Sequence, residues 1–230
     1  MNSRRLLDGV YPVLPTTFDA FGELDLGLFR RLVRFVVETG AQGMLVLGVM
    51  GEAPKLLPGE RAAAVQEAGA GAAAVLIARL ANEVSAITAV KLEDPPTPQK
   101  VTMVRERAPE GFRIFGGIGG VFLLEELHRG ANGTMTGFAF LELLVEIHRA
   151  YAAGCEREAA ETFFRYLPLI RFELQEAIGI AMRKRIYRLR GVIADDHVRA
   201  PSSRVDDLTA AELDELVAFT GLSLAPTTVC

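Results

Sequence analysis

Cysteines, long apolar runs and clustered charge are all scarce in this sequence, and each scarcity argues against a class of protein. The two cysteines, Cys155 and Cys230, are not spaced as metal or redox ligands. No segment has the roughly 20 apolar residues of a membrane span, and the first residues lack the apolar core of a secretory signal. The net charge of −4 is mild, without the basic stripe that binds nucleic acid. We therefore expect a soluble, cytoplasmic protein with neither nucleic-acid nor membrane partners.

The sequence does contain alternating strand and helix patterns, and half of its 230 residues are apolar. The predicted strands, the first with its exit loop, lie at 9–18, 43–48, 87–92, 112–115 and 133–138. Helical patterns lie at 26–38, 58–68, 75–82, 97–107 and 121–129, and the sequence reads as helical throughout after Phe140. Apolar strands between helices predict a parallel sheet covered by helices. Five strands suffice for an open sheet, whereas a closed (β/α)₈ barrel needs eight, so the local pattern leaves both architectures open.

Lys91 is the residue most suggestive of chemistry. It ends an apolar strand pattern, where burial would disfavour an ammonium and leave a neutral amine able to attack a ketone. The competing interpretation is a lysine that reaches solvent or pairs with Glu93 or Asp94, and the pattern alone favours it. Weaker candidates, in predicted loops or helices, are Lys55, Lys100 and Lys184.

Two glycine-containing loops follow predicted strands. Residues 48–52 could let backbone N–H groups approach a carboxylate, although an ordinary turn explains them equally well. The Gly116–Gly120 turn precedes a helix and could hold a phosphate or carboxylate, or could simply be a tight turn. It lacks the G-x-G-x-x-G spacing, so a nucleotide site is not favoured. Glu125, Glu126 and His128 lack a zinc-type spacing, and we interpret them as a solvated helix face.

Four stretches in this order resemble the dihydrodipicolinate synthase / N-acetylneuraminate lyase family. They are 9–18 with Gly22 and Asp25, 48–52 with Leu56 and Glu60-Arg61, 90–94, and 130–133 before the last strand. The resemblance implies a (β/α)₈ TIM barrel followed by helices. It also implies a Schiff-base lysine on the sixth strand, which Lys91 matches.

The implied activity is that of a class I lyase or aldolase, which needs no metal or cofactor and acts on pyruvate or a related 2-oxo acid. Lys91 would be catalytic. Similar enzymes hold the substrate carboxylate with two threonines, but here those positions are Val49 and Met50, so only backbone donors remain. The implied substrate-binding residues are Val49, Met50, Gly51, Gly116, Gly117 and Met135.

The middle of the chain departs from the family. Only two predicted strands precede Lys91, so about three βα units, the third to the fifth, are lacking. The join falls near 69–75, where either this sequence omits a stretch of the protein or the protein carries a real deletion. We favour the omission, and we expect the backbone to be interrupted between about Glu67 and Val75. Residues 1–140 would form the barrel portion, and 141–230 the last barrel helix and a helical region. The proton-relay tyrosine belongs to the lacking stretch; Tyr11, Tyr151, Tyr166 and Tyr187 do not match it.

Three alternatives stay open. The chain could be a keto-deoxy sugar acid dehydratase of the same family, using the same imine. It could be a catalytically inactive, ligand-binding paralogue. Outside the family, it could be a five-stranded phosphate-binding protein centred on the Gly116–Gly120 turn.

The resemblance also predicts a homodimer or homotetramer, because similar enzymes are commonly dimers or dimers of dimers. The helical tail from about Glu142 offers apolar surface to bury between subunits. Light scattering at micromolar concentration should therefore give a mass at least twice that of one chain. A monomeric mass would contradict the prediction.

Overall fold

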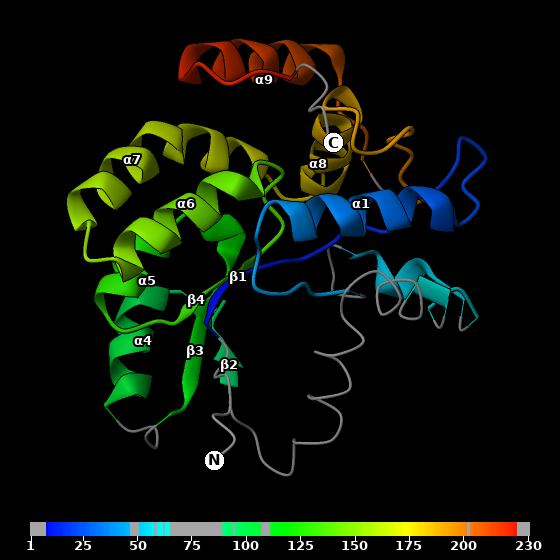
Figure 1. The fold of residues 1–230 in the computed structure, drawn as a ribbon. Coiled ribbons are helices and arrows are strands. Elements are labelled where there is room, and N and C mark those ends of the chain that lie inside the picture. Colours follow the sequence, from blue (N-terminus) through cyan, green and yellow to red (C-terminus); the bar gives the residue numbers. More distant parts are fainter. Residues whose placement is uncertain are drawn as a thin grey trace.

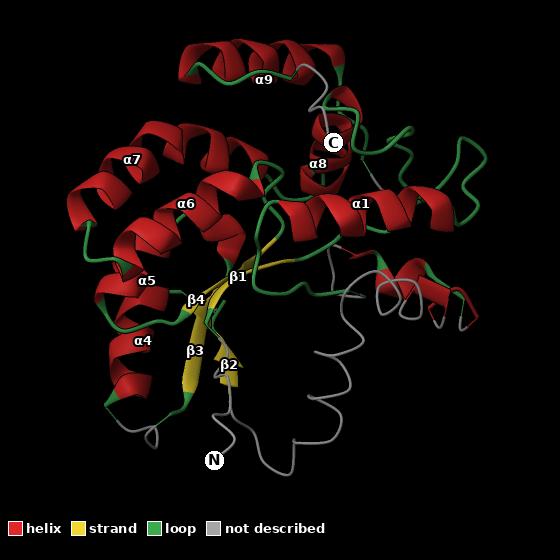
Figure 2. Ribbon diagram, viewed as in Figure 1, coloured by secondary structure: helices red, strands yellow, loops and turns green. Residues whose placement is uncertain are grey.

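The computed structural model describes residues 8–46, 51–57, 59–61, 63–64, 89–93, 95–106, 111–201 and 203–224. Short strands lie together, and the labelled helices lie to their left and above them in the view of Figures 1 and 2. The strands are β1 (Gly9–Pro12), β2 (Ala89–Lys91), β3 (Arg113–Gly116) and β4 (Gly133–Thr136). The helices are α1 (Leu26–Glu38), α4 (Thr97–Arg105), α5 (Leu123–His128), α6 (Leu141–Ala152), α7 (Glu156–Glu173), α8 (Gly179–Leu189) and α9 (Asp207–Thr220), with short 3₁₀ turns η2 (Ala53–Lys55) and η4 (Ile118–Gly120).

The order of the strands distinguishes a barrel from an open sheet. The sheet runs β1-β4-β3-β2, and all its pairings are parallel. On the other edge of β1, a parallel bridge joins Val13 to Leu45, which lies in the strand predicted at 43–48. Strands close in sequence are therefore neighbours, and the first strand is hydrogen-bonded to the last. That pairing is what a closed barrel requires, so the fold is a partial (β/α) barrel.

The stretch between the second strand and β2 is too short for the lacking barrel units. Residues 65–88 lie outside the described part of the chain, and they number 24. One βα unit of a barrel takes roughly 30 residues, so three strands with their helices cannot fit there. The predicted interruption between Glu67 and Val75 and the helix predicted at 75–82 also fall outside the described residues.

Alternation along the strands separates two faces. Val10 points to the side where α6 packs against β1, within the main apolar core. Tyr11 points the other way, and its ring meets that of Phe115 edge to face at 5.2 Å. Tyr11 pairs with Met135, and Phe115 pairs with Lys91. Side chains at paired positions of parallel strands share a face, so all four lie on the inner face, away from the helices.

The helices on the outer face begin and end where the sequence provides signals. The Asp25 side chain accepts a hydrogen bond from Leu28 N at 2.9 Å and caps α1. The apolar stripe of α1, which includes Leu32 and Val36, is buried as predicted. In Figure 1, α4, α5 and α6 gather on one side of β3 and β4.

The prediction of continuous helix after Phe140 is wrong for one stretch. Between α8 and α9, residues 190–206 contain no helix wherever the structure describes them (Figure 2). Gly191 adopts φ 70° just after α8, a conformation that favours glycine and ends a helix. This connection instead lies against the loops after the first two strands, because Arg199 donates to Gly22 O at 2.7 Å and to Lys55 O at 3.1 Å. None of the helices in the described residues is long and apolar enough to cross a membrane.

Glu126 corrects a second expectation, since it is fully buried rather than on a solvated face. Thr97 Oγ1 donates to Glu126 Oε1 at 2.6 Å, which ties α4 to α5. A methyl group on Gly116 would lie 1.6 Å from Glu126 Oε2, so that glycine makes room for the carboxyl group. Burial, the largest effect, raises the pKa of Glu126 to about 7.

Because its pKa is raised, Glu126 should make the stability of the fold depend on pH. The substitution Glu126→Gln should remove this contribution. The folded protein keeps the proton up to about pH 7, whereas the unfolded chain releases it near pH 4.5, so raising the pH through this window favours unfolding. Glutamine stays neutral and can still accept from Thr97. The free energy of unfolding, measured with urea, should therefore change in favour of the variant relative to the wild type as the pH rises. The change should amount to about 3 kcal/mol from pH 4.5 to above pH 7.

The matched control is Glu38→Gln, at an exposed position at the end of α1. Its unfolding curves should follow those of the wild type at every pH. Parallel pH dependences for Glu126→Gln and the wild type would contradict the prediction.

Candidate active site

Lys91 lies at the C-terminal end of β2, on the inner face of the sheet. Its Nζ is 2.9 Å from Glu93 Oε1, and the two side chains are 26% and 52% exposed. The inner-face position and the ion pair, which the sequence presented as competing interpretations, therefore occur together. The expectation of a buried, uncompensated amine is wrong, because Glu93 follows two residues later and reaches back to the ammonium. The C-terminal strand ends are where barrel enzymes carry out their chemistry.

The Gly116–Gly120 turn adjoins Lys91 through the same carboxylate. Ile118 N donates to Glu93 Oε1 at 3.3 Å. Ile118 and Gly119 have φ values of 46° and 67°, two successive residues in the left-handed region. A methyl group on Gly117 would lie 2.4 Å from Glu93 Cγ, so glycine leaves space for that side chain. The turn and the lysine thus already hold a carboxylate between them.

The second predicted loop is described from Gly51 onward, while Val49 and Met50 lie outside the described residues. Thr16 Oγ1 donates to Gly51 O at 2.6 Å, which fixes the loop to the chain leaving β1. Glu52, the next residue, has φ 55°, an uncommon conformation for a residue other than glycine, and its side chain is fully buried.

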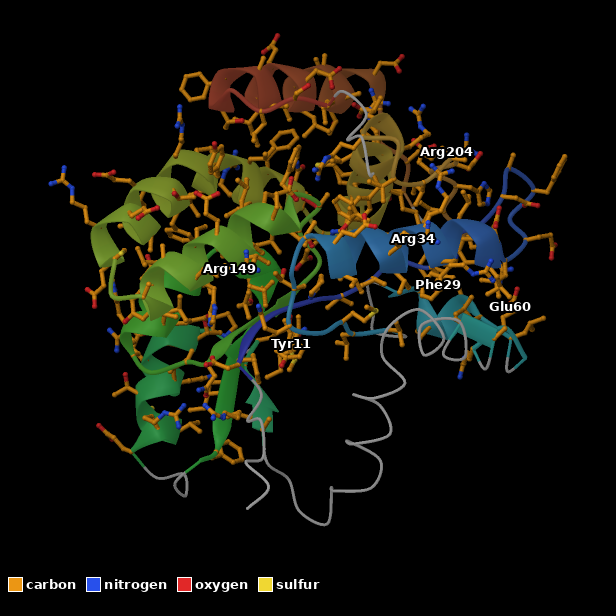
Figure 3. All side chains as sticks on the ribbon, in the orientation of Figure 1. Tyr11, Phe29, Arg34, Glu60, Arg149 and Arg204 are labelled. Atoms are coloured by element: carbon orange, nitrogen blue, oxygen red, sulfur yellow. The ribbon has the colours of Figure 1, made fainter. Side chains whose placement is uncertain are left out.

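The remaining predicted site residue, Met135, lies on β4 opposite Tyr11 on the inner face. The β1–β4 contact beside it is close, because a methyl group on Gly133 would lie 1.7 Å from Gly9 O. Tyr11, labelled in Figure 3, was set aside in the sequence because it does not match the relay tyrosine. Its position on the inner face follows from strand alternation, and burial raises the pKa of its hydroxyl.

Two functional candidates were underrated in the sequence. In the sequence, Glu93 was considered only as an ion-pair partner that would give Lys91 a structural role. In the structure, it connects Lys91 to the glycine turn. Lys184 was ranked below Lys91, yet it is fully buried and paired with Glu52. Its neighbours Arg183 and Arg185 make this part of α8 look solvated, so only the helical spacing of Met182 and Ile186 hinted that α8 packs inward. Within the described ranges, no three His, Cys, Asp or Glu side chains gather as a metal site.

Comparison with solved structures establishes the class of fold. Dihydrodipicolinate synthase from Rhodopseudomonas palustris superposes with a TM-score of 0.78 at 24% identity, over 93% of this chain and 97% of that one. A catalytic-lysine mutant of sialic acid aldolase from Ruminococcus gnavus gives 0.79 at 16% identity, over 96% and 98%. The chain therefore shares the barrel fold of these proteins.

Sequence comparison narrows this class. The model of the dihydrodipicolinate synthetase family matches residues 6–75. A 4-hydroxy-tetrahydrodipicolinate synthase from Synechococcus sp. (strain CC9902) is 38% identical over 79 residues, which cover 33% of this chain and 26% of the relative. The chain is thus related in sequence to the dihydrodipicolinate synthase family over its amino-terminal third, and it has that family's fold over nearly its whole length. The resemblance found in the sequence is confirmed.

A longer match also bears on the lacking barrel units. L-2-keto-3-deoxyarabonate dehydratase from Azospirillum brasilense is 25% identical over 284 positions, which cover 89% of this chain and 92% of the relative. The match covers 89% of this chain, about 205 of its 230 residues, so about 79 of the 284 aligned positions have no counterpart in it. At roughly 30 residues a unit, two to three βα units would take roughly 60 to 90 residues, a range that includes this number.

Proposed function

We propose that this protein is a class I lyase that forms a Schiff base between Lys91 and pyruvate or a related 2-oxo acid. The observation that carries the proposal is the position of Lys91, at the C-terminal end of an inner-face strand and beside a turn that already binds a carboxylate. The similarity to synthases, an aldolase and a dehydratase of one family supports it.

The chemistry would use the contacts around Lys91. A neutral amine attacks the ketone carbon, the resulting carbinolamine loses water, and an imine forms. Glu93 Oε1, 2.9 Å from Nζ, can take the proton that the ammonium must lose. Loss of a proton beside the imine then gives an enamine that attacks an aldehyde or imine, and cleavage is the reverse reaction. Substrate contacts would come from Val49, Met50, Gly51, Gly116, Gly117 and Met135.

A second candidate is dehydration of a keto-deoxy sugar acid through the same imine. It is favoured by the long match to a dehydratase and by the presence of Val49 and Met50 where the synthases have threonines. In this reaction a proton leaves the carbon beside the imine, and the hydroxyl on the next carbon departs as water. Glu93 would supply the acid and base function that both steps need.

The setting of the activity is also part of the proposal. We place the protein in the cytoplasm, as a homodimer or homotetramer with residues 1–140 as barrel portion and 141–230 as helical region. The free, exposed Cys155 suits a reducing compartment.

Lys91→Arg tests the Schiff base directly. Arginine keeps the positive charge and can still pair with Glu93, but a guanidinium does not form an imine with a ketone. Borohydride treatment with pyruvate should therefore attach the substrate to Lys91 in the wild type and to no residue in the variant, as read by peptide mass spectrometry. Turnover of a 2-oxo acid should also be lost, with the unfolding temperature nearly unchanged.

The matched control is Lys100→Arg, in α4, which should be trapped like the wild type. An adduct on Lys184, the most buried lysine of the described residues, would overturn the assignment of Lys91.

Glu93→Gln separates imine formation from the later proton transfers. The amide oxygen can still accept from Ile118 N, so the turn should keep its shape, but it cannot carry a proton between intermediates. Trapping of pyruvate at Lys91 should persist over long incubation, while turnover falls on the order of 100-fold or more. Full turnover in this variant would exclude Glu93 from the reaction.

A further inference from the structure

Arg113 is a charged residue of the sheet that the proposed reaction leaves unexplained. It begins β3, two residues before Phe115, so strand alternation places its side chain on the inner face. Across the pair with β2 it faces Ala89, whose side chain is a single methyl group. Lys91 lies two residues farther along β2, so Arg113 shares the inner face with Lys91 but lies nearer the N-terminal end of the sheet.

The guanidinium of Arg113 has no partner in the part of the chain that the structure describes. Its Nε is closed off from solvent without a hydrogen bond, although the residue as a whole is only partly buried. No carboxylate among the described residues forms an ion pair with it, and Glu93 pairs with Lys91 instead. Arginine keeps its charge at every ordinary pH, so it cannot adapt to this position by losing a proton. A buried donor without a partner destabilises a fold, and its presence calls for an explanation.

Tyr11 supplies a second polar group beside Arg113. Burial raises the pKa of Tyr11, whereas a hydrogen bond from the Asp8 backbone and the charge of Arg113 lower it, so the hydroxyl and the guanidinium are near enough to interact. Because that hydrogen bond is donated to the hydroxyl oxygen, the hydroxyl proton is left to donate elsewhere. The Asp8 carboxylate is 58% exposed and lies 3.5 Å from His148 Nε2, so it is engaged outside this pair.

We propose that Arg113 and the Tyr11 hydroxyl form a binding site for a small oxyanion, a phosphate or a carboxylate, on the inner face toward the N-terminal ends of β1 and β3. A planar guanidinium donates two parallel hydrogen bonds to such an anion, and the hydroxyl adds a third. The anion supplies the counter-charge that the described residues do not. The site is separate from the proposed catalytic one, because Lys91 and the Gly116–Gly120 turn lie at the C-terminal strand ends.

Inorganic phosphate is the first probe, because it presents the paired oxygens that a guanidinium binds. Isothermal titration calorimetry of the whole chain, against chloride of matched ionic strength, should give one phosphate per chain. Arg113→Met should raise the dissociation constant about tenfold or more, since it removes charge-assisted hydrogen bonds. Tyr11→Phe keeps the ring against Phe115 and should raise it about threefold. Acetate, titrated in the same way, shows whether a carboxylate or a phosphate is preferred, and tighter binding of either one supports the site.

Arg34→Met is the matched control, because it removes the same charge from an exposed position on α1, which Figure 3 labels. It should leave the dissociation constant unchanged. The unfolding temperature without phosphate is a second readout: Arg113→Met should unfold no lower than the wild type, because an apolar side chain replaces a donor that had no partner.

Three outcomes would overturn the site. They are no phosphate binding by the wild type, equal affinity in the wild type and Arg113→Met, and an Arg113→Met variant that unfolds at a markedly lower temperature without phosphate, as the loss of a well-paired structural arginine would cause. None of them bears on the Schiff-base proposal, which borohydride trapping at Lys91 tests separately.

Discussion

The pairing of the first strand with the last is the constraint on which the rest of the structure depends. It is possible because two glycines face each other: at Gly133 any side chain would collide with Gly9 O. β1 pairs with β4 on one edge and is bridged to Leu45 on the other, so the strands follow one another around the sheet in the order of the sequence. The inner face therefore collects Tyr11, Lys91, Phe115 and Met135 from distant parts of the sequence, all near the same end of the sheet.

A second set of contacts joins the helical region to this sheet, and it consists of buried charge pairs. Besides Lys184, α8 contributes Arg183, which donates to Glu173 Oε1 at 3.0 Å, and Arg190 follows the helix and binds Glu142. Glu173 in turn accepts from Ala139 N, and Arg190 donates to Ala139 O, just beyond the last strand. One helix thus fixes the loops after the second and the last strands, which a purely apolar contact would hold with less directional precision.

The positions of the strands could be predicted from the sequence, because β1 to β3 contain short apolar runs next to glycine or charged residues, and β4 combines β-branched threonines with a methionine after a glycine. Their order could not, since five strands fit two architectures and pairing is a long-range property. Lys91 was recognisable as a lysine ending an apolar strand, but its contact with Glu93 and the turn required the fold. The burial of Glu126 and Lys184 was missed for one reason, since a charged side chain on a helix is ordinarily expected to be solvated. Their burial depends on features that only the fold reveals: the space left by Gly116 for Glu126, and the buried partner Glu52 for Lys184. The predicted substrate contacts at Val49 and Met50 remain predictions.

The Glu93 carboxylate also affects which ligands can bind beside Lys91. Because Glu93 already accepts from Ile118 N and pairs with Lys91, it competes, as part of the same chain, with any carboxylate from solution for these two groups. An anion from solution that only replaces Glu93 exchanges equivalent contacts and gains little. In the proposed reaction, a 2-oxo acid also forms a covalent bond with Lys91, which shifts the exchange in its favour. Selectivity for 2-oxo acids over simple carboxylates would then come from the contact between Glu93 and Ile118 N that a substrate carboxylate must replace, as much as from the other groups around Lys91.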